Sequence, residues 1–253
     1  MHIFTEKKTE IIMRARQTES FFNTVKSNAA MVGLSVNEKK TQVLCISASN
    51  HSNNSAYVRM EDGTKIQSQE QLCQLGFIFG TRPNMDRNMD HLATKFRKRL
   101  WLLRHLKKAG IPQDDLLQMY KCFLLSVLDF GSVVYHSMVT NGQKHELDRL
   151  QAAALKIIYG RARSHNQLMQ SLEGRLEFLE DRRQRMVDKF ILKTADNENY
   201  RERWFPTRQI TSHNLRTDTY YLEENARTNR LFNAPIFYYR RRLNQIRRPA
   251  DRR

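Results

Sequence analysis

Residues 95–135 read KFRKRLWLLRHLKKAGIPQDDLLQMYKCFLLSVLDFGSVVY and carry the strongest periodic pattern of the chain. Apolar residues recur here at steps of three and four, which predicts a helix with one buried face from about residue 84. Gly110 and Pro112 end this helix, and Pro112 opens a second one whose first turn contains Asp114 and Asp115. We interpret these two aspartates as partners of the helix dipole rather than as metal ligands.

Two further helices are expected downstream. One apolar stripe runs from Leu147 to Ile158 and ends at Gly160, and another runs over about residues 176–195. Acidic residues and arginines are mixed over residues 177–188, which is typical of a solvent-exposed face whose charges pair with one another.

The periodicity fades after Asn197, and the rest of the chain is rich in arginine. Three roles stay open for its arginine clusters. Together with Tyr238 and Tyr239 they could bind single-stranded RNA by charge and stacking. They could equally form a disordered basic tail or a nuclear-import signal.

The first 80 residues mix helix and strand signals. Residues 11–31 predict a helix that Gly33 ends, and residues 41–46 predict a strand. A turn at Asp62-Gly63 predicts a hairpin of two short strands on either side of it. A further strand is expected over residues 72–79, interrupted by Gly76.

The fold class that follows is α+β, in three parts. Residues 1–82 form a small part with strands, and residues 83–195 form a mostly helical bundle. Residues 196–253 form a basic, Arg-rich part for which partial disorder is one of the options.

The composition favours a nucleic-acid partner. Lys and Arg number 43 against 26 Asp and Glu, and the resulting net charge of +17 suits a polyanion. No apolar run approaches the roughly 20 residues of a membrane span, and the first residues lack a signal-peptide pattern. Three cysteines are too few for a disulfide scaffold. We therefore expect an intracellular protein, nuclear or cytoplasmic, that has no membrane segment.

Several motifs resemble the reverse transcriptases of non-LTR (LINE-like) retrotransposons. The segment AMVGLSVNEKKTQVL over residues 30–44 resembles polymerase motif D, and LCQLGFIFG over residues 72–80 resembles motif E, the primer-grip hairpin. Residues 95–135 are similar to the helical thumb, and GRLEFLEDRRQRM over residues 174–186 matches a block downstream of it. The resemblance covers most of residues 1–195 and implies a palm remnant over residues 1–82, followed by a thumb-like region.

The catalytic carboxylates of that family have no counterpart here. In the family, an aromatic-x-Asp-Asp turn in motif C and an Asp of motif A hold two magnesium ions. MHIF at residues 1–4 resembles the strand that follows this turn, so we expect the chain to begin just after the catalytic motifs. We therefore expect no cofactor and no metal in this chain, whereas Mg²⁺ belongs to the parent polymerase.

The resemblance implies roles for individual residues. Lys40 matches the motif D lysine, a general acid for the departing pyrophosphate that has a task only if a palm is supplied. A solvated lysine at the entrance of a strand is the alternative. Leu75, Gly76 and Phe77 match the primer grip, where a glycine lets the backbone approach a sugar-phosphate; an ordinary strand with a glycine bulge is the alternative. The charge pattern itself adds a further site: the helix around residues 95–108 carries cations without interleaved acids, which suggests a face that follows the phosphates of a duplex. An ordinary solvated face is the alternative. The predicted nucleic-acid-binding set on that helix is Lys95, Lys98, Arg99, Arg104, Lys107 and Lys108.

Two functions of different classes follow. The first is a truncated RNA-directed DNA polymerase fragment that binds an RNA or DNA template–primer but polymerises nothing by itself. The alternative is a helical interaction module, or an inert pseudogene product with no substrate. A third possibility is that the chain complements a separately encoded palm.

Overall fold

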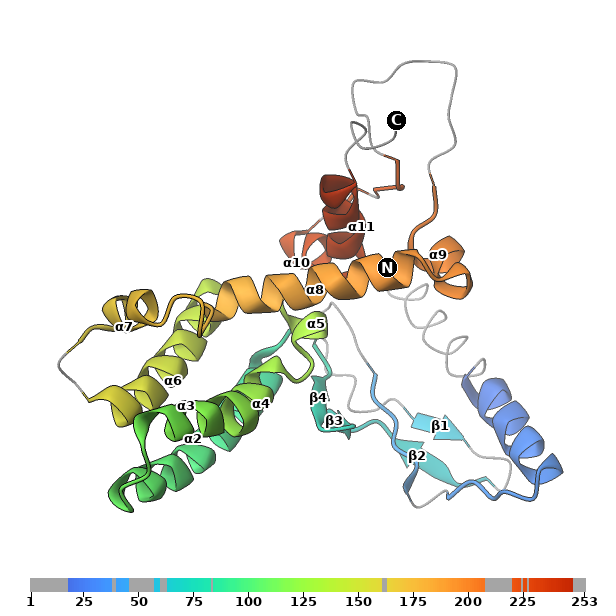
Figure 1. The fold of residues 1–253 in the computed structure, drawn as a ribbon. Coiled ribbons are helices and arrows are strands. Elements are labelled where there is room, and N and C mark those ends of the chain that lie inside the picture. The colour runs from blue at the N-terminus through green and yellow to red at the C-terminus, as the bar shows by residue number, and fades with distance from the viewer. Residues whose placement is uncertain are drawn as a thin grey trace, which may run out of the picture. The chain divides into compact units, whose positions relative to one another are not determined.

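The computed structural model describes residues 18–37, 40–45, 57–59, 63–82, 84–160, 163–207, 220–223, 225–226 and 228–247. The chain divides into two compact units, Met1–Arg87 (unit 1) and Asn88–Arg253 (unit 2). It is mostly helical and has two small antiparallel sheets, so its class is α+β (Figure 1). None of the described helices combines the length and the apolarity that crossing a bilayer requires.

Unit 1 begins, in its described part, with a helix over residues 18–31 that ends in a turn at Gly33. Gly33 has a φ of +75°, a conformation that glycine adopts without a steric cost at a helix end. This confirms the predicted helix end; the predicted first residues, 11–17, lie outside the described part.

The strands of unit 1 form two separate hairpins. β1 (Tyr57–Arg59) pairs with β2 (Lys65–Gln67), and β3 (Gln71–Gln74) pairs with β4 (Phe77–Gly80), both antiparallel. The first hairpin confirms the expected pairing across the Asp62-Gly63 signal, although Asp62 itself is not among the described residues.

Two strand predictions need correction. The strand expected over residues 72–79 is divided into β3 and β4, because the backbone reverses at Leu75 and Gly76, which both have positive φ. A strand was expected over residues 41–46. In the described part of this segment, residues 41–45, the structure shows a single parallel bridge between Val43 and Ser68 instead.

Unit 2 contains the predicted helices. α2 (Asp86–Lys108) begins at the unit boundary, and its buried residues confirm the predicted apolar stripe from Leu92 to Leu103. The predicted second helix is α3 (Gln113–Met119), a π-helical turn η2 (Tyr120–Leu124) and α4 (Leu125–Asp129) in direct succession. Asp114 and Asp115 lie in the first turn of α3, as predicted for dipole partners.

Among the remaining helices of unit 2, α8 (Leu179–Ala195) runs between the earlier helices of this unit and the C-terminal ones (Figure 1). The short helix α5 (Ser132–Tyr135) packs against α8, and α6 (Asn141–Tyr159) begins with a capping box formed by Thr140 and Gln143. α7 (His165–Ser171), which the sequence analysis missed, follows the predicted end of α6 at Gly160.

The charge pattern over residues 177–188 predicted a self-paired solvent face, which the structure confirms only in part. Within this segment Glu177 pairs with Arg185 at 2.7 Å and lies 3.9 Å from Arg182. Arg182 instead binds Asp129 of α4, and Arg183 is 2% exposed with its Nε and Nη1 atoms lacking a hydrogen-bond partner. Periodicity alone could not reveal this, because the partners lie on helices distant in the sequence.

Much of the segment interpreted as a basic tail is folded. It contains α9 (Glu198–Trp204), α10 (Asn229–Phe232) and α11 (Pro235–Ile246). α11 packs on α8, and Tyr239 and Leu243 join a buried apolar cluster with Val187, Ile191 and Phe205. Disorder therefore does not apply to residues 229–246.

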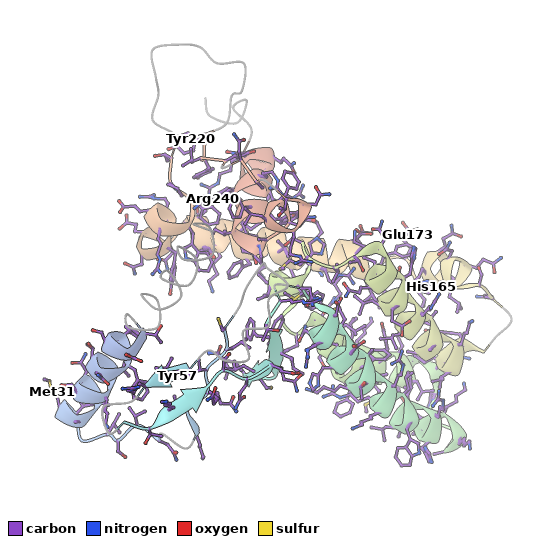
Figure 2. The ribbon with its side chains drawn as sticks, turned by 180° about the vertical axis from the view of Figure 1, so that it is seen from behind. Met31, Tyr57, His165, Glu173, Tyr220 and Arg240 are labelled. Atoms are coloured by element: carbon purple, nitrogen blue, oxygen red, sulfur yellow. The ribbon has the colours of Figure 1, made fainter. Side chains whose placement is uncertain are left out.

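The arginines of α11 are used in internal contacts. Arg240, labelled in Figure 2, is 8% exposed and donates from Nε to the Trp204 carbonyl at 2.8 Å. Arg242 binds the Asp188 carboxylate with two hydrogen bonds of 2.8 Å, and the Arg241 guanidinium lies 3.4 Å from the centre of the Phe232 ring. These contacts leave little of the cluster available for the RNA-binding role considered above.

Candidate nucleic-acid interface

The exposed face of α2 brings together cations and one large aromatic residue. Phe96, Leu100 and Leu103 are buried on the opposite face, which fixes the orientation of the helix in unit 2. Positions 98, 101, 105 and 108 are three or four residues apart and therefore line up on the outer face. We call Lys98, Trp101, His105 and Lys108, with Lys95 and Arg104 at the edges, the basic stripe.

The cations of the basic stripe are available to a ligand. Lys95, Lys98, Arg104 and Lys108 are all exposed, and none has an ion-pair partner among the residues that the structure describes. No acidic residue occurs between residues 91 and 108, so their positive charges are not neutralised along the helix.

Three other cations of the same helix have internal partners. Arg97 forms an ion pair with Glu146 of α6. Arg99 lies over the Phe123 ring, 4.3 Å from its centre, and donates to the Phe123 carbonyl. Lys107 donates to the Ile158 carbonyl at 3.1 Å. Of the predicted binding set, Arg99 and Lys107 thus help to hold α2 against neighbouring helices.

Trp101 is a feature of this face that the sequence analysis missed. Its side chain is 59% exposed, and its ring centre lies 3.8 Å from that of His105. A ring nitrogen of His105 is 2.9 Å from the Trp101 carbonyl oxygen, so the two rings form a short exposed platform. The available signal was the position of Trp101 outside the apolar stripe, since exposed aromatic rings among cations are typical of base-stacking surfaces.

The predicted primer-grip residues lie at the tip of the β3–β4 hairpin in unit 1. Leu75 and Gly76 form the turn, with φ of +51° and +83°, and Leu75 is 89% exposed. Phe77 is 6% exposed and contacts the Phe79 ring at 4.8 Å between ring centres. The backbone of the turn is thus open to an approaching ligand, whereas the Phe77 side chain supports the hairpin from inside.

Leu75 is strained, because a residue with a Cβ atom meets a steric cost in the left-handed region. Replacing Leu75 by Asn, which tolerates this conformation, should raise the free energy of unfolding by about 1 kcal/mol. Urea denaturation followed by circular dichroism measures the change. Leu75→Ala is the matched control and should be nearly neutral; a destabilised Asn variant would contradict the strained turn.

Lys40 is exposed and lies in a short turn next to the helix end of unit 1. The Asn37 side chain accepts a hydrogen bond from the Lys40 backbone N–H, and the Thr41 hydroxyl donates to the Asn37 carbonyl. Within the described residues, no hydrogen bond or ion pair joins Lys40 to the hairpin tip. The described residues contain no group of three His, Cys, Asp or Glu that could hold a metal ion.

Comparison with known proteins adds no assignment. No protein-family model matches the chain, and neither curated proteins nor solved structures show a significant similarity to it.

Proposed function

We propose that this chain is a fragment of a non-LTR retrotransposon reverse transcriptase that binds template–primer nucleic acid and does not polymerise alone. In this proposal unit 1 corresponds to the palm remnant, with the motif D turn at Lys40 and the motif E hairpin at Leu75–Gly76. The helices from α2 onward correspond to the thumb and the region after it. The order of these motifs in the sequence, with a two-stranded hairpin where motif E is expected, supports the assignment.

The observation that carries the binding proposal is the basic stripe of α2. It presents lysines that have no ion-pair partner within the described ranges around an exposed tryptophan, with no carboxylate interleaved. Lysine and arginine on one face neutralise successive phosphates without reading the sequence. Trp101 adds a surface on which an unpaired base at a template end can stack.

A salt titration tests this function. If Lys95, Lys98, Arg104 and Lys108 each neutralise one phosphate, log K should fall against log salt with a slope of about −4. Fluorescence anisotropy with a labelled RNA–DNA duplex carrying a single-stranded overhang gives this slope. Absent binding, or an affinity that does not change with salt, would contradict the proposal.

The alternative function, an interaction module, is favoured by a different observation in unit 1. Apolar side chains on or just after the helix over residues 18–31 are largely exposed: Phe21 (70%), Met31 (79%), Val32 (70%) and Leu34 (65%). Figure 2 labels Met31 at the end of this helix. Three of these exposed residues fall within residues 31–34, and neighbouring exposed apolar residues favour a protein partner. Strong binding of a hydrophobic dye, without any nucleic-acid binding, would select this function.

A further inference from the structure

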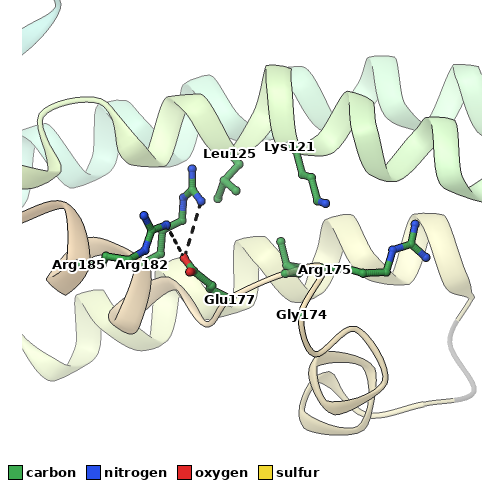
Figure 3. A pocket seen from close by; sticks show the side chains of 8 residues that line it. Lys121, Leu125, Gly174, Arg175, Glu177, Arg182 and Arg185 are labelled. Atoms are coloured by element: carbon green, nitrogen blue, oxygen red, sulfur yellow. Dashed lines mark hydrogen bonds and ion pairs between the residues drawn. The ribbon is translucent and has the colours of Figure 1, made fainter.

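A second cationic site lies in unit 2, in a cleft between η2 and the segment that leads into α8. Its volume is about 360 Å³, and Figure 3 shows the side chains that line it. One wall comes from η2 and the residue after it, and the other from residues 174–177 and the first turns of α8. The charged lining residues are Lys121, Arg175, Arg182, Arg185 and Glu177.

Each arginine of this cleft pairs with a carboxylate but keeps part of its guanidinium group free. Arg182 uses Nε and Nη2 for the Asp129 carboxylate, at 2.8 to 3.1 Å, and this hydrogen bonding raises its pKa. Its Nη1 atom is left 3.9 Å from Glu177, beyond hydrogen-bond distance. Arg185 holds the same Glu177 oxygen at 2.7 Å and is 58% exposed. Arg182 and Arg185 thus each have a carboxylate partner, Asp129 and Glu177, and each retains unused N–H donors.

Lys121 supplies a free charge opposite them. It has no ion-pair partner among the described residues, and Figure 3 places its ammonium group on the cleft side of η2. Leu125, one turn further, is 2% exposed and gives this wall an apolar floor. Arg175, which pairs with Asp114 at 2.6 Å, also lines the cleft.

Gly174 shapes the second wall. Its φ of +77° turns the chain between α7 and the residues that precede α8. A side chain at this position would be strained. The turn sets Arg175 and Glu177 along the same cleft.

We propose that this cleft binds a phosphate group. A tetrahedral oxyanion accepts several charge-assisted hydrogen bonds at once, from a lysine as a point charge and from the free edges of arginines. The lining offers both kinds of donor from opposite walls, and Lys121 adds a positive charge that no described carboxylate pairs with. The phosphate can belong to a nucleotide in solution or to the backbone of a nucleic-acid strand, since both present the same oxygens.

The cleft is separate from the basic stripe. Phe123, which contacts Arg99 of α2, is two residues after Lys121 and therefore lies on the opposite side of the helix. Phosphate binding in the cleft does not rest on the proposed function, because it can be measured without nucleic acid.

The test is calorimetric titration with inorganic phosphate, at constant ionic strength in chloride buffer. Wild type should bind phosphate saturably, and Lys121→Gln with Arg185→Gln should weaken binding by about tenfold or more. Lys189→Gln with Lys193→Gln, two exposed lysines of α8 outside the cleft, is the matched control and should bind phosphate as wild type does. Circular dichroism verifies that both double variants fold.

Two results would overturn the proposal: no saturable phosphate binding by wild type, or an unchanged affinity in the Lys121→Gln, Arg185→Gln variant. Competition then identifies the source of the phosphate. An oligothymidylate without terminal phosphate that displaces inorganic phosphate supports a backbone phosphate. Displacement by a mononucleotide alone supports the same site with a free ligand.

Discussion

Replacing Lys98, Arg104 and Lys108 together by glutamate is expected to weaken duplex binding by about 100-fold or more at moderate salt. Each lysine or arginine that neutralises a phosphate contributes a salt-dependent part of the affinity, and a glutamate adds repulsion in its place. All three side chains are exposed, so the substitutions remove no buried contact. Fluorescence anisotropy measures the loss, and circular dichroism should show unchanged helicity.

A charge-matched control separates the basic stripe from the general positive charge of the chain. Lys189, Lys193 and Arg201 are also exposed, on α8 and α9, and their replacement by glutamate changes the net charge equally. This control should lose much less affinity, because no phosphate contact is assigned to those residues. An equal loss in both triple variants would mean that the charge acts nonspecifically, and the assigned interface would be wrong.

Replacing Phe205 by alanine is expected to lower the free energy of unfolding by about 3–4 kcal/mol. Phe205 is fully buried beyond the end of α9, and its ring lies 6.0 Å from that of Tyr221. It shares a cluster with Val187 and Ile191 of α8 and Leu243 of α11, so the truncation leaves a cavity between segments far apart in the sequence. Thermal and urea denaturation measure the loss.

Phe232 provides the matched control in the same C-terminal segment. It is 47% exposed and contacts the Arg241 guanidinium, so Phe232→Ala should cost less than about 1 kcal/mol. Should Phe205→Ala prove as mild as Phe232→Ala, the C-terminal helices would not be part of the folded core.

The sequence predicted the elements whose apolar residues repeat with the helical period. Leu92, Phe96, Leu100 and Leu103 mark the buried face of α2, and Leu147 to Ile158 mark that of α6, because every turn of these helices buries a residue of the same kind. The short helices α5 and α7 were missed, since four and seven residues carry too little periodicity to identify.

The C-terminal helices were missed for a chemical reason. α11 buries Tyr239 and Arg240 beside Leu243, and an arginine beside an aromatic residue is not counted as part of an apolar face. Arginine can bury its aliphatic stem while its guanidinium finds a carbonyl or carboxylate, as Arg240 and Arg242 do with Trp204 and Asp188. These partners are remote in the sequence, so a pattern search cannot find them.

The candidate interface could likewise be predicted from the sequence only in part. The charge pattern indicated the helix face and included Lys98, Arg104 and Lys108, which the structure leaves exposed. It could not separate these from Arg99 and Lys107, whose internal contacts depend on where η2 and α6 pack. The spacing of apolar residues along the sequence also does not show whether an aromatic residue such as Trp101 is exposed on the surface or packed in the core.

Fluorescence of Trp101 tests the central claim most directly. The chain has two tryptophans, so Trp204→Phe leaves Trp101 as the only reporter. If nucleic acid binds the basic stripe, a template–primer with a single-stranded overhang should quench this fluorescence saturably, with the same midpoint as anisotropy, because bases stack on the exposed ring. If anisotropy reports binding while the Trp101 signal stays constant, the nucleic acid does not occupy the basic stripe, and the account is contradicted.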